Sequence, residues 1–317
     1  MEQKVKNGIN YTAGVGAGYA VFKYVPKYLI KKPYQKFYMK QFNNIKENEN
    51  NILFNSAKRA FENSKYSTSG ITIVDVNSEN YKKVAETVIE LGHIKDKERA
   101  EKLLQKNKER MRKKGKEYKE SSAVKAVDKW LKKFTEKIDN TKRKQIKEIA
   151  VGKNACFAPD VQKVLVNKDK MGFSTFHEIG HGITWKSGGL KAFNAGFGNV
   201  LGLIGIPLVL AIGLLKNKKK EGEDTKGFWD KTTTFIKNNC AVLAGACLIS
   251  TIIDEGLASK NGAKLAKNVL DKNLYKKLIK LQGIAFTSYI SSMLILTGMT
   301  ALAVGLRDKI VENKILK

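Results

Sequence analysis

The stretch Phe173-Ser-Thr-Phe-His-Glu-Ile-Gly-His-Gly-Ile-Thr-Trp185 holds two of the three histidines in this chain, four residues apart. On a helix, residues four apart lie one above the other on the same face. His177 and His181 could therefore bind one metal ion, with Glu178 beside them to take a proton from a water molecule. This pattern predicts a catalytic Zn²⁺ site, in which one coordination position stays open for water. The alternative is a helix whose two histidines are ordinary polar residues.

The flanking residues predict that this stretch is a helix entering a core. Its apolar side chains recur at helical spacing, and they are Phe173, Phe176, Ile179 and Ile183. Ser174 or Thr175 could cap the start, and Gly188-Gly189 would end the helix.

A zinc site needs a third protein ligand, and Glu255 is the candidate. Asp254 and Glu255 follow an apolar run, 241–253, where carboxylates are costly unless they are paired or bound to metal. The alternative is that this acidic pair only marks a helix end at the water boundary. The remaining histidine, His93, lies in a charged region and is expected to be a surface residue.

These motifs together resemble the membrane-embedded gluzincin peptidases, a group with the HtpX-type proteases, the CAAX prenyl proteases and related bacterial membrane zinc peptidases. The resemblance covers roughly residues 150 to 265, from a strand pair before the motif to Glu255-Gly-Leu-Ala-Ser259. It implies that His177, His181 and Glu255 bind zinc and that Glu178 is the general base.

One departure from the HtpX-type pattern concerns the residue four positions after the third ligand. That pattern often has an aspartate there, which orients a zinc-bound imidazole, whereas this chain has Ser259. A serine can accept the same hydrogen bond more weakly. Ser259 and Asp254 are therefore the candidates for supporting the ligands, and the subfamily stays open.

A segment before the motif is the candidate for binding an extended substrate. In proteases of this type an edge strand can hold a peptide by backbone pairing. The candidate strand residues are Asn154, Ala155, Cys156, Phe157 and Ala158. An oxyanion stabiliser is also needed, and Tyr275, Tyr289 and Arg307 are available without anything in the sequence to select among them.

Charge and cysteine content narrow the class of protein. The chain has 59 basic and 30 acidic residues, a net charge of +29, which attracts anionic lipid or nucleic acid. Lysines mixed with aromatic residues over 23–40 favour an anionic membrane leaflet, and no recognised nucleic-acid-binding module is present. The three cysteines show no metal-knuckle spacing, which fits reduced thiols in a cytoplasmic or membrane setting.

Apolar segments predict an integral membrane protein. The segment 195–215 is long enough to cross a bilayer, and 240–258 would form a hairpin with it across a basic loop, 216–239. The segment 284–306 is also long enough, while 1–24 is a weak anchor or an interfacial helix.

The predicted fold is therefore mainly α, with a helical zincin-like core, a small β element and about three to four membrane segments. Residues 25–150 form a basic helical cytoplasmic region, with a strand at 71–76 and helix breaks at Gly92 and Gly115. The zinc peptidase core spans 151–265, and 266–317 forms a C-terminal helix and membrane segment.

The predicted topology follows from the metal ligands. His177, His181 and Glu255 can bind one ion only if they lie on the same side of the membrane. An even number of membrane crossings must therefore separate the two histidines from Glu255. The excess of lysine near the N-terminal segment favours an inner-membrane protein with its active site in the cytoplasm. A cluster of lysines at 216–220 conflicts with that orientation unless the hairpin is re-entrant, with its bend at Pro207.

The predicted function is hydrolysis of membrane-associated or misfolded proteins by a membrane-bound zinc metalloendopeptidase, with Glu178 as general base. Two alternatives stay open. One is a basic membrane-anchored protein that binds anionic lipid or nucleic acid and has a non-catalytic metal site. The other is a transporter-like bundle, which the small number of spanning segments argues against.

Overall fold

The computed structural model describes residues 2–25, 40–42, 44–115, 122–189, 201–217 and 227–312. The chain is mainly helical with one small sheet, as predicted. It divides into two compact units. The first, here called the sheet unit, comprises Ile45–Ile183 and Asn261–Tyr275, and the second, the helical unit, comprises Met1–Asn44, Thr184–Lys260 and Lys276–Lys317.

The sheet unit is built on three short strands, β1 (Thr72–Asp75), β2 (Cys156–Ala158) and β3 (Lys163–Val166). β3 lies in the centre, parallel to β1 and antiparallel to β2. Its residues Val164 and Val166 are fully buried, which explains why an apolar run forms the central strand. The predicted strand at 71–76 and the predicted strand pair before the histidine motif are both confirmed.

Short helices connect the sheet to the histidine motif. They are α3 (Glu47–Glu62), η2 (Ser67–Ser69), α6 (Lys168–Met171), η3 (Gly172–Ser174) and α7 (Thr175–Lys186). The buried side chain of Asn50 in α3 accepts a hydrogen bond from the backbone N–H of Phe173 at 3.2 Å. Gly172 lies so close that a Cβ there would be 2.0 Å from the Asn50 carbonyl oxygen. α3 therefore fixes the backbone that leads into α7.

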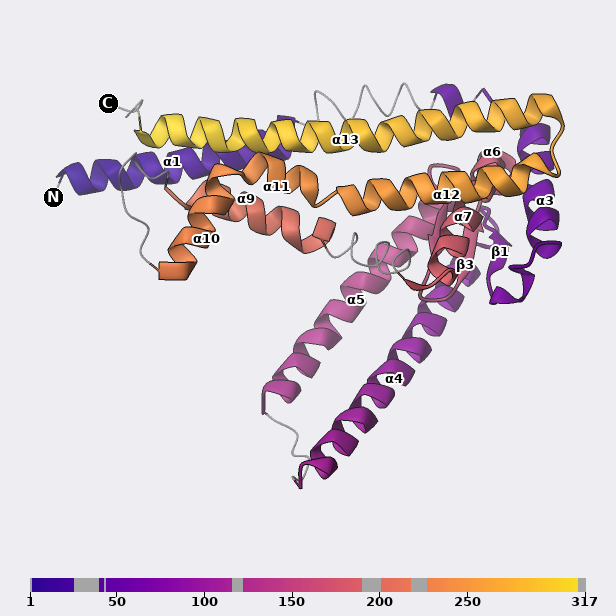
Figure 1. The fold of residues 1–317 in the computed structure, drawn as a ribbon, viewed down its shortest axis with the longest axis horizontal. Coiled ribbons are helices and arrows are strands. Elements are labelled where there is room, and N and C mark those ends of the chain that lie inside the picture. Colours follow the sequence, from indigo (N-terminus) through magenta and orange to yellow (C-terminus); the bar gives the residue numbers. More distant parts are fainter. Residues whose placement is uncertain are drawn as a thin grey trace. The chain divides into compact units, whose positions relative to one another are not determined.

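A long helical hairpin, α4 (Tyr81–Lys113) and α5 (Ser122–Ala150), belongs to the same unit (Figure 1). Gly115 adopts φ 64° after α4, so the predicted break there is confirmed. The break predicted at Gly92 is wrong, because α4 continues through it. A Cβ at Gly92 would lie 3.0 Å from the Lys142 ammonium, which is the flexible end of a side chain of α5.

The hairpin packs its base onto the sheet through one apolar core. Its buried members are Val76, Ala85, Val88, Ile146, Ile149, Ala150, Val161 and Leu165. Apolar residues at helical spacing on both helices thus meet Leu165 of β3.

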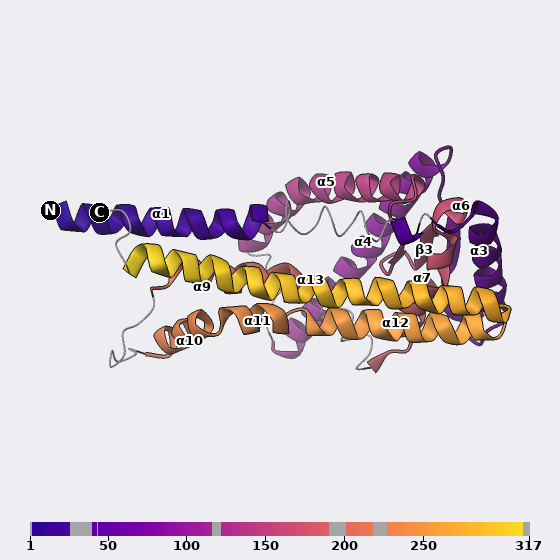
Figure 2. The same cartoon turned by 90° about the horizontal axis from the view of Figure 1, so that it is seen from above.

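The helical unit holds the apolar segments. Its helices are α1 (Glu2–Val25), η4 (Leu201–Gly205, a π-helix), α9 (Ile206–Leu215), α10 (Gly227–Asn238), α11 (Cys240–Ala246) and most of α12 (Ile249–Lys267) and α13 (Lys272–Glu312). α11 and α12 run alongside α13 (Figures 1 and 2). Small residues allow close packing, since a Cβ at Gly18 of α1 would lie 2.6 Å from the Ala303 carbonyl oxygen of α13.

Two segments of the described chain are long and apolar enough to cross a membrane, Cys240–Lys267 and Lys272–Val311. Each has a mean hydropathy of 1.7 over its most apolar window, and only 22% of that window is buried within the chain. A core helix of a soluble protein would bury most of such a window, so the exposed apolar surface indicates membrane association. The predicted segments at 240–258 and 284–306 lie within these two helices.

The prediction of about three to four membrane segments is not met by the described residues, which contain two such helices. Of the predicted segment 195–215, the first residues lie outside the described ranges, and the rest forms η4 and the ten-residue helix α9. Pro207 stands in the first turn of α9, directly after the π-helix η4, so the change from π- to α-helical geometry occurs at this proline. The predicted N-terminal helix is observed as α1, and most of 23–40 lies outside the described ranges.

Candidate metal centre

The histidine motif forms α7 as predicted. Phe176, Ile179 and Ile183 are fully buried on one face of the helix, which is the apolar pattern seen in the sequence. Gly188 and Gly189 follow with φ of 63° and 60°, a conformation that glycine adopts without strain and that ends the helix.

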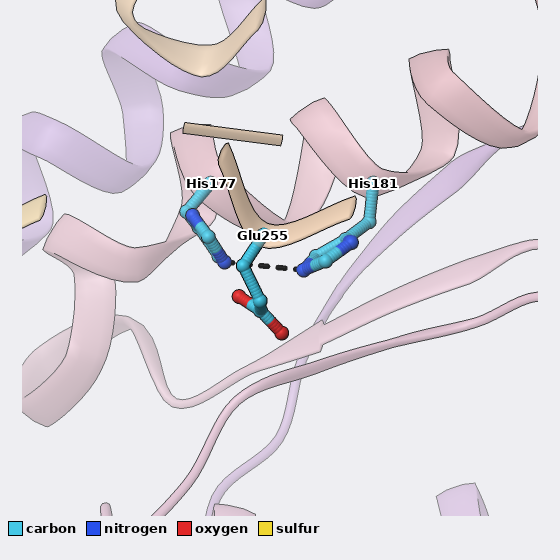
Figure 3. A group of neighbouring side chains, drawn as sticks. All are labelled: His177, His181 and Glu255. Carbon is cyan, nitrogen blue, oxygen red and sulfur yellow. Dashed lines mark hydrogen bonds between the residues drawn. The ribbon is translucent and has the colours of Figure 1, made fainter. Parts of the chain in front are cut away.

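His177 and His181 lie one turn apart on α7, and their side chains point toward a common position (Figure 3). Their Nε2 atoms are 3.1 Å apart. The two rings are nearly perpendicular, with an interplanar angle of 88° and centroids 4.7 Å apart. Two nitrogens are thus presented side by side, as predicted from the four-residue spacing.

This spacing fits a shared zinc ion. Zn–N bonds of about 2.0–2.1 Å to two nitrogens so placed would subtend roughly 100° at the metal, close to a tetrahedral angle. The same spacing also allows an N–H···N hydrogen bond if one Nε2 carries a proton. The donor set therefore fits zinc but does not require it.

Glu255 of α12 is the third member of the group (Figure 3). Ligand atoms of His177, His181 and Glu255 all lie within 4.8 Å of one another. The glutamate is 9% exposed, and so is largely removed from water. Among the described residues, no other group of three histidine, cysteine or carboxylate side chains has this arrangement.

The position of Glu255 follows from a contact farther along the same helix. In the sheet unit, a Cβ at Gly262 of α12 would lie 2.4 Å from the Phe176 carbonyl oxygen and 3.1 Å from the His177 nitrogen. Because Glu255 is seven residues, or about two helical turns, before Gly262, it lies on the same face of α12. α12 is continuous over both residues.

Glu178, the predicted general base, is buried at 8% exposure. It lies close to β2, because its charge is felt at the Cys156 thiol. Burial is the main cause that raises the pKa of Cys156 to about 12, and the negative charges of Glu178 and Asp160 add to it. The motif glutamate therefore faces a largely water-free environment beside the predicted substrate strand.

The predicted substrate strand is an edge strand beside α7. Asn154 and Ala155 precede it, and β2 itself pairs only with β3 among the described strands. The Phe157 ring packs against α7 at Gly182, where a Cβ would come within 3.3 Å of it. Among the described strands, one backbone edge of β2 is thus unpaired.

Other predicted residues can also be placed. Asp254 and Ser259 flank Glu255 on α12, with Ser259 one helical turn after it. His93 is a half-exposed residue on α4 with its Nε2 3.1 Å from Asp139, so the surface histidine is confirmed. Arg307 is fully buried and donates hydrogen bonds to Asp308 and Asn217, which removes it as an oxyanion candidate.

Residues that position the site were not foreseen from the sequence. They are Asn50 and Gly172, which set the contact of α3 with η3 before α7, and Gly182 and Gly262, which set contacts of α7 with β2 and α12. A single glycine inside an apolar or polar run gives no pattern by which such a contact can be predicted.

Comparisons with protein-family models, with curated proteins and with solved structures found no match to this chain. Its function has to be inferred from the geometry and chemistry of the site.

Proposed function

We propose that this protein is a membrane-bound zinc metallopeptidase that hydrolyses peptide bonds. The observation that carries the proposal is the convergence of His177, His181 and Glu255, whose ligand atoms lie within 4.8 Å of one another, with Glu178 on the same helix turn. The resemblance of these motifs to the membrane-embedded gluzincin peptidases supports the same assignment.

The three ligands leave one position of a tetrahedral site open, as a catalytic zinc requires. Zinc held there would supply a Lewis acid that polarises a peptide carbonyl and makes water more acidic. Glu178 would take the proton of the attacking water and return it to the amine that leaves.

The substrate would lie extended along β2. An unpaired strand edge offers N–H and C=O groups at the spacing of a peptide backbone. Because these groups would hydrogen-bond to the backbone of the substrate, peptides of many different sequences could bind. Cys156, Phe157 and Ala158 would provide this edge, with Asn154 and Ala155 continuing it. Such recognition suits membrane-associated or misfolded protein substrates, whose common feature is an extended segment.

The active site would face the cytoplasm in this proposal. The ends of the two candidate spans that adjoin residues 268–271 are rich in lysine, which favours the cytoplasmic side and an anionic leaflet. These lysines are Lys260, Lys264, Lys267, Lys272, Lys276, Lys277 and Lys280. Glu255 lies little more than one turn before the first of them, so the metal ligand would be near the same boundary.

A second function is favoured by the net charge of +29. A basic membrane-anchored protein would bind anionic lipid through lysines, with a non-catalytic metal site. It predicts salt-sensitive binding to anionic vesicles without cleavage of any substrate.

Cleavage of an unfolded reporter such as casein by detergent-purified protein separates these functions. The wild type should cut casein, a zinc chelator should stop it, and Glu178→Gln should be inactive. Glu62→Gln, an exposed glutamate at the end of α3, is the matched control and should cut like the wild type. Equal cleavage by Glu178→Gln and the wild type would rule out the proposed role of Glu178. Absence of cleavage by the wild type would leave the lipid-binding function.

A further inference from the structure

Helix α10, labelled in Figure 1, carries three large aromatic side chains that are exposed. Phe228 is 74% exposed, Trp229 77% and Phe235 59%. The Phe228 and Trp229 rings contact each other edge to face, with centroids 5.6 Å apart. Three exposed aromatic residues within twelve residues form an apolar surface that a water-exposed helix would not normally carry.

The opposite face of α10 forms hydrogen bonds with α9 and α13 of the helical unit. Lys237 is 3% exposed, and its Nζ donates to the Gly213 carbonyl of α9 and to Asp308 of α13, each at 2.6 Å. Asp230 accepts a hydrogen bond from Lys216 at the end of α9. At 100° per residue, Lys237 points about 180° away from Phe228. These bonds therefore fix which face of α10 is outward.

We infer that α10 is an interfacial helix whose aromatic face inserts at the boundary between the headgroups and acyl chains of a phospholipid bilayer. This inference depends on the membrane association of the helical unit and not on the zinc chemistry. Phe228, Trp229 and Phe235 would be the inserted side chains. Aromatic residues, above all tryptophan, are enriched at this depth of membranes because an apolar ring and a polar edge are both satisfied there.

Continuity with a candidate span points to lipid rather than to another protein. α10 is followed by Asn239 and then directly by Cys240–Lys267, which is long enough to cross a bilayer. The exposed apolar surface continues along that segment at Val242, Ile249 and Ile253, which are 69%, 51% and 46% exposed. One lipid bilayer could therefore cover the exposed apolar residues of both α10 and the following span.

Charge on the outward face fits a headgroup region. Lys231 is exposed and lies between Phe228 and Phe235 on the same face of α10. Its flexible stem could lie on apolar surface while the ammonium contacts a lipid phosphate. The aromatic rings and this lysine together resemble the composition of interfacial helices.

The inference can be tested by the depth of Trp229 in vesicles. The chain has three tryptophans, so Trp130→Phe with Trp185→Phe leaves Trp229 as the single reporter. The protein would be reconstituted into phosphatidylcholine–phosphatidylglycerol vesicles that contain lipids brominated at shallow or deep acyl positions. A matched control replaces all three tryptophans by phenylalanine and adds Ile52→Trp, at a 48% exposed position of α3 in the sheet unit.

The inference predicts blue-shifted emission from Trp229, weak quenching by aqueous acrylamide, and stronger quenching by shallow than by deep bromines. The control indole should be quenched by acrylamide and not by brominated lipid. Quenching of Trp229 by acrylamide as strong as in the control would overturn the inference. Protection from acrylamide without quenching by either brominated lipid would also overturn it, because a second protein copy would then cover the face. Loss of peptidase activity would not bear on this result.

Discussion

Gly262 of α12 lies directly against the backbone of Phe176 in α7, where a Cβ would come within 2.4 Å of the Phe176 carbonyl oxygen. This contact sets the separation of two helices inside the sheet unit. One of them carries His177 and His181, and the other carries Glu255 two turns earlier. The proposed zinc site thus depends on a close contact that only glycine allows.

The first prediction is that Gly262→Ala weakens zinc binding. The added methyl group would push α12 away from α7, which moves Glu255 relative to the two imidazoles. Zinc affinity should fall on the order of 10- to 100-fold, as for other changes that disturb the support of metal ligands. Competition with a fluorescent zinc chelator measures this affinity.

Gly256→Ala is the matched control on the same helix. A Cβ there would make an ordinary contact of 3.5 Å with the Phe286 ring, so zinc affinity should stay unchanged. Equal zinc affinity of Gly262→Ala and the wild type would show that the α7–α12 contact does not position Glu255.

The second prediction concerns the contact of α3 with η3, the short helix that leads into α7. Gly172→Ala would place a Cβ 2.0 Å from the Asn50 carbonyl oxygen, so the backbone must shift. Overpacking of this kind should lower the free energy of unfolding by about 1–3 kcal/mol. Chemical denaturation followed by circular dichroism measures it. Gly283→Ala, with open space around the glycine, should be neutral or stabilising by up to ~1 kcal/mol.

The strongly periodic parts of the chain were predictable. The position of α7 followed from apolar spacing and from the two histidines, and the strands followed from short apolar runs. Glu255 could be proposed because a carboxylate after an apolar run is costly without a partner. For α7, the strands and Glu255, the structure that the local sequence favours is also the one that the packing of the folded chain requires.

Other parts depended on contacts that no local pattern encodes. Gly92 favours a helix break by itself, but α4 continues through it, with the Lys142 side chain of α5 beside it. α10 lies within 216–239, which was predicted to be a basic loop. In the structure, Thr232 and Thr233 donate to carbonyls one turn earlier, and Lys237 ties the helix to α9 and α13. Tertiary bonds therefore overcame weak helix propensity.

The third prediction concerns Asp308, which bonds both Lys237 and Arg307 at 2.6 and 2.9 Å. Both cations are almost completely buried, with side-chain exposures of 2% and 0%. Asp308→Asn would leave two buried positive charges without a carboxylate and should cost about 3 kcal/mol or more of unfolding free energy. Thermal unfolding in detergent should therefore occur at a clearly lower temperature.

An exposed ion pair is the control for this loss. Asp96 and Arg99 are 68% and 59% exposed, so Asp96→Asn should change stability by less than ~1 kcal/mol. Equal unfolding temperatures of Asp308→Asn and Asp96→Asn would contradict the prediction, because the charges of Lys237 and Arg307 would then not depend on the Asp308 carboxylate for their stability.

The fourth prediction concerns pH. Burial raises the pKa of the Cys156 thiol from about 9.0 to about 12, so the folded protein holds this proton more tightly than the unfolded chain. The stabilisation is complete below pH 9 and is lost as pH rises toward 12. Metal-free protein should therefore lose stability over this range, and Cys156→Ala should lose less. The free energy of unfolding, measured by urea denaturation, would be compared between the wild type and Cys156→Ala. If it fell equally with pH in both proteins, the raised pKa of Cys156 would be contradicted.

The most direct test of the central claim is the zinc content of purified protein, measured by elemental analysis after removal of loosely bound metal. The site predicts about one zinc per chain in the wild type and in Glu178→Gln, because Glu178 is not a ligand. Glu255→Ala should lose most of the metal while remaining folded by circular dichroism. A wild type without stoichiometric zinc, or a Glu255→Ala protein that retains it fully, would contradict the proposed metal centre.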